Sequence, residues 1–87
     1  MQIHIWVGIG AWSFSVMKTA GEGSDGFPWP ITPGMMIAAH DDANVYTVSS
    51  VKVVPGRAYV RCHVPFWSEA DAVLARQEWV EAGNDLA

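Results

Sequence analysis

Two extended runs with alternating side chains dominate the middle of the chain, between Val45 and Phe66. The runs, residues 45–54 and 57–65, are rich in β-branched and aromatic residues, and Pro55-Gly56 separates them. Such residues favour strands. Proline fixes the first angle of a turn and glycine accepts a positive φ, so this pair is typical of a type II turn. The sequence therefore predicts a hairpin in which Val54 faces Arg57.

This register sorts the hairpin side chains onto two faces, because alternate residues of a strand share a face. The first face should be core and carries the pairs Val53 with Ala58, Val51 with Val60, Ser49 with Cys62 and Thr47 with Val64. The second face is polar and basic and carries the pairs Lys52 with Tyr59, Ser50 with Arg61 and Val48 with His63. A slip of one residue would exchange the faces on one strand, so the register is itself a prediction.

Alternation also marks the N-terminal segment, residues 2–17. One side carries Ile3, Ile5, Val7, Ile9 and Ala11, and the other carries His4, Trp6, Gly8, Gly10, Trp12 and Phe14. Glycine inside a strand often marks a bulge or bend. We therefore expect either one long strand over 2–17 or two short strands with a kink at Gly8–Gly10. Another short strand is expected at 35–39, followed by a turn at 40–44.

A long loop rich in glycine and proline is expected over residues 19–34. Long loops in small domains are often functional. Phe27 and Trp29 alternate with prolines, which stiffen the backbone. These two rings could project outward as a recognition pair, or the segment could fold as a strap over an open edge of the core.

The C-terminal part predicts one helix, over about residues 68–83. Ser68 with Asp71 three residues later forms a capping box, and Gly83 is typical of a helix end. At 100° per residue the helix has two apolar sides. The side expected to pack on the sheet consists of Ala70, Val73, Leu74 and Val80. The side expected to be left over consists of Ala72, Ala75, Trp79 and Ala82. The loop, a second copy or a partner could cover it.

Composition and charge add two constraints. Hydrophobic residues make up 51% of the 87 residues and charged residues only 16%, which is more apolar than a single small domain needs and suggests that a partner covers some of this surface. The net charge of −4 is unevenly distributed: residues 45–66 carry +3, residues 67–87 carry −4 and residues 1–44 carry −3. An acidic helix, with Asp71 and Glu78 between its apolar sides, could dock on a basic partner.

The sequence contains no recognised arrangement for catalysis, cofactor or metal binding. Cys62 is the only cysteine, so it cannot form an internal disulfide, and this usage fits a reducing cytoplasm. Cys62 and His63 are neighbours on a strand and point to opposite faces, which disfavours a shared metal ion. The apolar stretch at 3–17 is too short to span a membrane as a helix, and no lysine or arginine precedes it and no clear cleavage site follows it, as a targeting signal would require. We therefore expect a non-enzymatic protein without cofactor, metal or membrane.

Together these elements predict one domain, residues 1–87, of the α+β class. We expect a curved antiparallel sheet of four or five strands with one C-terminal helix. The run PGMMIAAHDDANVYTVSSVKVV, residues 33–54, resembles the strand–turn–strand of SH3-like barrels. This resemblance implies closure of the sheet into a small β-barrel and no particular activity.

For function, the first hypothesis is a small acidic protein–protein interaction module. Its partner-binding residues would be Trp79, Ala72, Ala75, Ala82, Phe27, Trp29, Asp71 and Glu78. A compact, acidic chain without catalytic motifs resembles phage or mobile-element accessory proteins, including anti-CRISPR proteins. That resemblance implies binding and inhibition of a host defence protein, and the acidic helix favours a basic, nucleic-acid-handling partner.

Two alternatives stay open. The first is a nucleic-acid-binding small β-barrel that uses the basic and aromatic residues Lys52, Tyr59, Arg61 and His63. The second is a self-associating structural or virion assembly subunit, with the Trp79 face paired in a homodimer.

Overall fold

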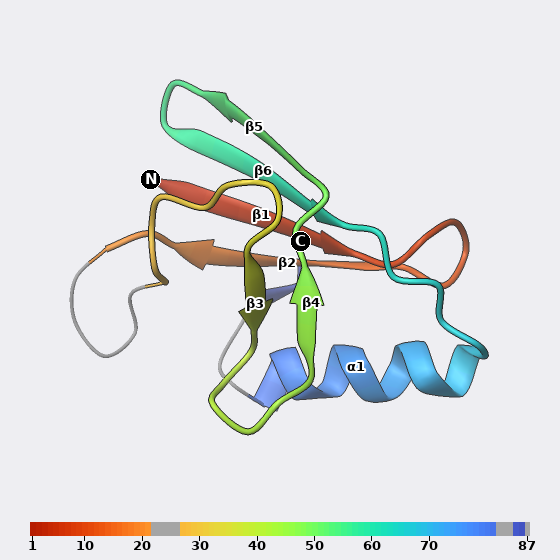
Figure 1. The fold of residues 1–87 in the computed structure, drawn as a ribbon. Helices are drawn as coiled ribbons and strands as arrows, with labels where there is room; N and C mark the ends of the chain where they lie inside the picture. Colours follow the sequence, from red (N-terminus) through yellow and green to blue (C-terminus); the bar gives the residue numbers. More distant parts are fainter. Residues whose placement is uncertain (22–26, 82–84, 87) are drawn as a thin grey trace.

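β1 (Gln2–Val7) and β6 (Arg57–Cys62) run parallel to each other at the centre of a five-stranded sheet in a computed structural model of the protein (Figure 1). The structure describes residues 1–21, 27–81 and 85–86. The strand order is β5-β6-β1-β2-β7, with β5 at Ser50–Val54, β2 at Phe14–Thr19 and β7 at Asp85–Leu86. A two-stranded sheet of β3 (Met36–Ala38) and β4 (Val45–Thr47) and one helix, α1 (Glu69–Glu81), complete an α+β fold.

The predicted α+β class and its single C-terminal helix are confirmed, but the sheet is mixed rather than antiparallel. β1 forms a hairpin with β2 on one edge, and its other edge pairs with β6. β6 forms its own antiparallel hairpin with β5 and lies parallel to β1, so the contact between the two hairpins is parallel. In the described part of the chain no pairing joins the outer strands β5 and β7, so the expected SH3-like barrel does not close.

The N-terminal segment is two strands rather than one, and the chain reverses between them. Gly8 has a φ of 113°, and a Cβ at this position would lie 2.5 Å from the Trp12 carbonyl oxygen. Only glycine allows this close approach. The hydroxyl of Ser13 donates a hydrogen bond to the Gly10 carbonyl over 2.6 Å, which tightens the turn.

The predicted strand at 45–54 is divided between the two sheets. The Val48 amide donates to the Met35 carbonyl over 2.8 Å, while the next amide, that of Ser49, donates to the Arg61 carbonyl over 2.7 Å. Thr47 consequently pairs with Met36 and not with Val64. The predicted strand at 57–65 likewise ends at Cys62.

Within β5 and β6 the predicted register is confirmed. Val54 pairs with Arg57, Lys52 with Tyr59 and Ser50 with Arg61. Gly56 has a φ of 78°, the value that a type II turn requires at its third position. The core face of β6 is also as expected, since its buried side chains are Ala58, Val60 and Cys62. On the partner segment the prediction was wrong for Val53, which is 61% exposed, and for Val48, which was expected on the polar face and is buried.

The helix packs with the face opposite to the one expected. Trp79 is completely buried, and Ala72 and Ala75 are buried beside it. Val73, Leu74 and Val80, which were expected to face the sheet, are 42%, 61% and 45% exposed. The physical reason is that two alanines let the helix backbone approach the core closely while the large indole fills the space beyond them. Ala82 lies outside the described residues.

Part of the expected recognition loop also belongs to the core. Phe27 is buried, and its ring centroid lies 6.2 Å from that of Trp79. Trp29 is partly buried and packs against the same core. Residues 27–31 therefore act as the strap, and Trp79, Ala72, Ala75 and Phe27 offer no free surface to a partner. No helix in the described ranges is long and apolar enough to cross a membrane.

A matched pair of tryptophan variants tests this arrangement. Trp79→Ala should lower the free energy of unfolding by about 3–5 kcal/mol, because it opens a large cavity in the core. Trp67→Ala should change it by less than about 0.5 kcal/mol, because the Trp67 side chain is 91% exposed. Urea denaturation followed by circular dichroism measures both values, and similar losses in the two variants would contradict the assigned helix face.

Alkaline pH should destabilise the fold through two buried acids. Burial raises the pKa of the Cys62 thiol from 9.0 to about 11. Burial, and then the nearby Glu78 carboxylate, raise the pKa of Tyr46 from 10.0 to about 12. Both groups ionise more easily in the unfolded chain, so the stability that they contribute is complete below their unfolded pKa values and is lost as the pH rises through the folded ones.

The free energy of unfolding should therefore fall from about pH 9 upward. Cys62→Ala should flatten the decline between about pH 9 and 11, and Tyr46→Phe should flatten its upper part. Denaturant titrations at stepped pH measure the slopes. If neither substitution changes the slope, these groups are not the cause.

Candidate functional site

The main sheet has one covered face and one open face. Ile3, Ile5 and Val7 of β1 are completely buried, as are Val16 of β2 and Val60 of β6, and they form one core with Trp79. The intervening residues of the same strands point the other way, because side chains alternate. They form the open face.

Strand pairing places the side chains of the open face in two adjacent rows across the sheet. From β5 to β2, the first row is Lys52, Tyr59, His4 and Met17. The second row, in the same order, is Ser50, Arg61, Trp6 and Ser15. Neighbouring rows on one face of a sheet are roughly 7 Å apart, which is two residues along a strand.

Each row brings a cation and aromatic rings together. In the first row the rings of His4 and Tyr59 contact each other, with centroids 5.2 Å apart and planes inclined by 30°. In the second row the guanidinium carbon of Arg61 lies 5.8 Å from the centre of the Trp6 ring, a cation–π geometry. Trp6 remains 41% exposed despite this contact.

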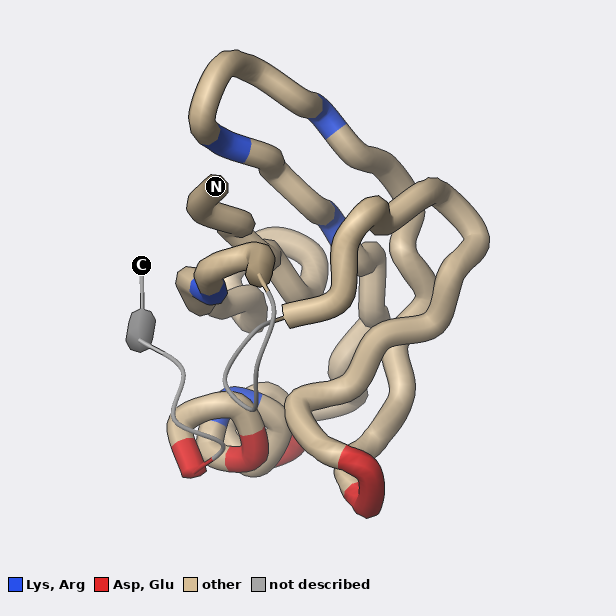
Figure 2. Tube along the Cα trace, turned by 90° about the vertical axis from the view of Figure 1, so that its left-hand side faces the viewer, with Lys and Arg blue, Asp and Glu red and all other residues tan. Residues whose placement is uncertain are grey.

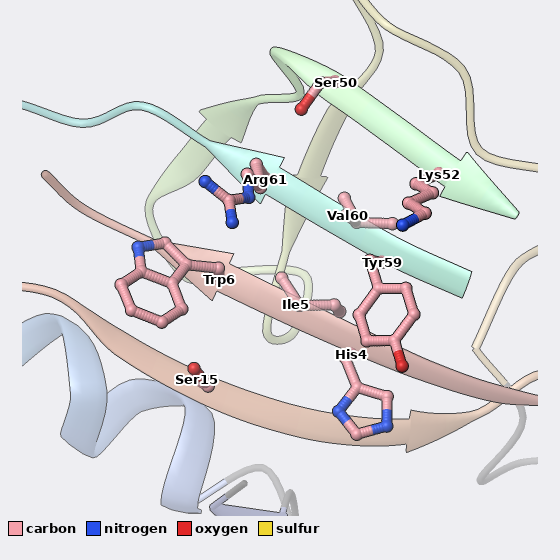
Figure 3. A pocket seen from close by; sticks show the side chains of 9 residues that line it. All are labelled: His4, Ile5, Trp6, Ser15, Ser50, Lys52, Tyr59, Val60 and Arg61. Atoms are coloured by element: carbon pink, nitrogen blue, oxygen red, sulfur yellow. The ribbon is translucent and has the colours of Figure 1, made fainter. Parts of the chain in front are cut away.

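A cavity of about 360 Å³ lies on this face, and side chains of both rows line it (Figure 3). Figure 3 shows the rings of Trp6 and Tyr59 at opposite ends of the group of lining residues. A second hollow, bordered by Trp6, Arg61 and His63 together with the turn residues Gly8, Ile9 and Gly10, continues beyond Trp6. We name the set His4, Trp6, Lys52, Tyr59, Arg61 and His63 the basic–aromatic strip.

Charge is separated across the molecule (Figure 2). Lys52, Arg57 and Arg61 gather on the β5–β6 hairpin, and residues 45–66 contain no acid. The acidic residues of the described structure lie chiefly on α1 and in the turn at Asp41 and Asp42, away from that hairpin. The open face is thus locally positive on a protein of net charge −4.

The strip includes all four residues of the nucleic-acid alternative and adds two that sequence reasoning did not assign. Lys52, Tyr59 and Arg61 lie on the open face as the hairpin register predicts, and His63 borders its end. His4 and Trp6 join them only because β1 pairs with β6. The alternation of the first strand placed these two side chains on a shared side, but no local signal indicated which strand would lie next to it.

The other expected site residues do not form one site. Asp71 is exposed near the start of α1, and its amide donates to the Ser68 hydroxyl over 3.3 Å. Glu78 is partly buried and accepts hydrogen bonds from the amide and side chain of Asn44, over 3.1 and 3.0 Å. Both residues lie on the helix, whereas the residues that were expected to surround them belong to the core.

Among the described residues, no group of three or more histidine, cysteine, aspartate or glutamate side chains could hold a metal ion. Cys62 is buried and its pKa is raised, so at neutral pH it is a protonated thiol. A thiol in that state is a poor nucleophile. The rings and cations of the open face offer stacking, cation–π contact and charge neutralisation.

Comparisons with known proteins identify no relative of the chain. No protein-family model, no curated protein and no solved structure matches it. The functional argument consequently depends on the geometry of the basic–aromatic strip and on the charge distribution.

His4 provides a test of how the strip is built. Its Nε2 atom is shielded from solvent and has no hydrogen-bond partner among the described residues. An unsatisfied buried nitrogen is costly, so His4→Phe should raise the free energy of unfolding by about 1 kcal/mol and keep the ring contact with Tyr59. Denaturant unfolding measures the change. His63→Phe, at an exposed position, is the control and should leave stability within about 0.5 kcal/mol; a destabilised His4→Phe would contradict the assignment.

Proposed function

We propose that this protein is a non-enzymatic binding protein that holds single-stranded nucleic acid across the open face of its sheet. The observation that carries the proposal is the pair of adjacent rows, each of which combines aromatic rings with a cation. Unpaired bases stack on aromatic rings, while the backbone phosphates contact lysine and arginine. The basic–aromatic strip supplies both kinds of contact on one face.

Single strands fit this face better than a duplex. Bases in a duplex are stacked on each other and cannot lie on a protein ring, whereas unpaired bases can splay onto an exposed sheet. The two rings of the central strands, Trp6 on β1 and Tyr59 on β6, give two stacking positions on either side of the cavity. The cavity of about 360 Å³ has the size of a small-molecule pocket and could take one base with its sugar.

The charge distribution favours a modest electrostatic contribution to affinity and one preferred orientation of the bound nucleic acid. The cations Lys52, Arg57 and Arg61 can neutralise only a few phosphates, so salt dependence should be shallow, with a slope of about −2 in log affinity against log salt for three contacts. The acidic helix would be repelled by the same polyanion. Charge separation therefore favours encounters through the β5–β6 hairpin.

The hypothesis of a phage-encoded inhibitor of a host defence protein, of the anti-CRISPR kind, remains a proposal, and binding of nucleic acid is compatible with it. The sites that the sequence suggested for this role need revision, because Trp79 and its alanine neighbours are core. The same burial leaves no Trp79 surface for a homodimer. The single, buried and unpaired Cys62 supports the proposal of a cytoplasmic location.

Fluorescence anisotropy with labelled 12-nucleotide single strands of DNA and RNA, and with a duplex control, tests the proposal. Tyr59→Ala and Trp6→Ala should each weaken binding by about 5- to 150-fold, since one stacked base contributes about 1–3 kcal/mol. Arg61→Ala should also reduce the salt slope by about 0.7.

Two matched controls locate the site. Arg76→Ala removes a cation on α1, and Trp67→Ala removes an exposed indole that is not part of the strip; both should leave affinity unchanged. Absence of binding at about 100 μM protein in low salt, a concentration at which non-specific binding is already detectable, would refute the proposal. Equal losses from Arg76→Ala and Arg61→Ala would refute the assignment to the strip.

A further inference from the structure

Three large apolar side chains are exposed around one groove that shares only His63 with the basic–aromatic strip. Trp67 is 91% exposed, Leu74 is 61% exposed and Val45 is 56% exposed. All three line the same groove, which has a volume of about 600 Å³. Its walls are β4, the segment of residues 63–67 and the first turns of α1. Clustered exposed apolar surface of this kind marks an interaction site.

The groove follows the edge of β4. Val45 and Thr47 are exposed and Tyr46 is buried, so their side chains lie on opposite faces of the strand. Val45, Tyr46 and Thr47 nevertheless all line the groove, so the groove lies beside the edge of β4 and not over one of its faces. Within the described structure β4 pairs only with β3. A strand that is paired on one side can accept another extended chain on the other.

The groove is held open by contacts at both ends. The Glu78 carboxylate accepts two hydrogen bonds from Asn44 and ties the start of β4 to α1. On the opposite wall, the His63 amide donates to the Ser49 hydroxyl over 3.1 Å. Phe66 stacks near Phe14, with ring centroids 6.4 Å apart, and fixes the segment that carries Trp67. A preformed groove loses little conformational entropy on binding.

Charge indicates the kind of occupant. Asp71 lines the groove beside Leu74, and α1 carries Glu69, Asp71, Glu78 and Glu81 against Arg76 alone. A second copy bound by two-fold symmetry would bring two acidic helices together, which is unfavourable. A basic segment would instead complement the helix.

We propose that the β4–α1 groove binds an extended segment of another protein that combines a large apolar side chain with lysine or arginine. The segment lies beside β4, its apolar side chain packs between Trp67 and Leu74, and its basic side chain faces Asp71. The groove shares only His63 with the strip, and the anchors Trp67, Leu74 and Asp71 lie outside the strip, so the inference does not depend on binding of nucleic acid.

Selection from a displayed library of random 12-residue peptides, with the wild-type protein as bait, tests the inference. Enriched peptides should pair lysine or arginine with a large apolar residue. Synthetic copies are then titrated against the wild type by fluorescence anisotropy. Leu74→Asp and Trp67→Ala should each weaken binding by about tenfold or more, as at a buried anchor, and Asp71→Asn should weaken it and lower its salt dependence.

Controls separate this site from the strip and from a fold defect. Tyr59→Ala should bind the peptides as the wild type does, and Leu74→Asp should retain the wild-type circular dichroism spectrum and unfolding midpoint. Amide exchange at Val45 and Thr47 should slow when peptide is bound, because strand addition protects these groups.

Several results would overturn the inference. They are a library that yields no binder, enrichment of acidic peptides, or affinities that Leu74→Asp and Trp67→Ala leave unchanged. Light scattering at high protein concentration gives the remaining outcome: a dimer that Leu74→Asp dissociates would show that a second copy occupies the groove.

Discussion

The burial of Trp79 is the interaction on which the rest of the architecture depends. Its indole fills the space between the helix, the strap at Phe27 and the inner face of the main sheet. Ala72 and Ala75 let the helix come close enough for this packing. Because the helix, the strap and the small sheet all gather around this one core, none of these elements covers the opposite face of the main sheet. The exposed rows of β1 and β6 are thus a consequence of one-sided packing.

The same arrangement gives the molecule two surfaces of different chemistry. The face that packing leaves bare carries cations and rings, because the residues that alternate with the buried ones of β1 and β6 are His4, Trp6, Tyr59 and Arg61. The helix that covers the other face brings its acids with it, and its second apolar side remains exposed at Leu74. Polyanions and basic peptides would therefore be sorted to different sides of one small domain.

How much the sequence predicts depends on the range of the interaction. The register of β5 and β6 follows from Pro55-Gly56, because turn chemistry is local, and it placed Lys52, Tyr59 and Arg61 on one face correctly. The parallel pairing of β1 with β6 joins segments more than fifty residues apart and leaves no local pattern, so His4 and Trp6 were missed. The helix face was wrong for another reason: both sides are apolar, and periodicity alone cannot show whether a bulky indole or three aliphatic chains will face the core.

At Val48 and Ser49 the chain passes from the small sheet to the main sheet. Their successive amides bond to different sheets, so the peptide link between Val48 and Ser49 is a short covalent connection between the two sheets, alongside the core packing of Ile37 and Tyr46. Moving the termini to this link by circular permutation would leave the two sheets joined only through longer connections. New termini at the exposed turn Pro55-Gly56 would leave the residue pairs of the β3–β4 and β5–β6 ladders intact, although the Gly56 carbonyl also accepts a hydrogen bond from the Gln2 amide over 3.1 Å. We therefore expect a chain break after β5, at Pro55-Gly56, to disturb the two sheets less than a break before β5, at Val48-Ser49.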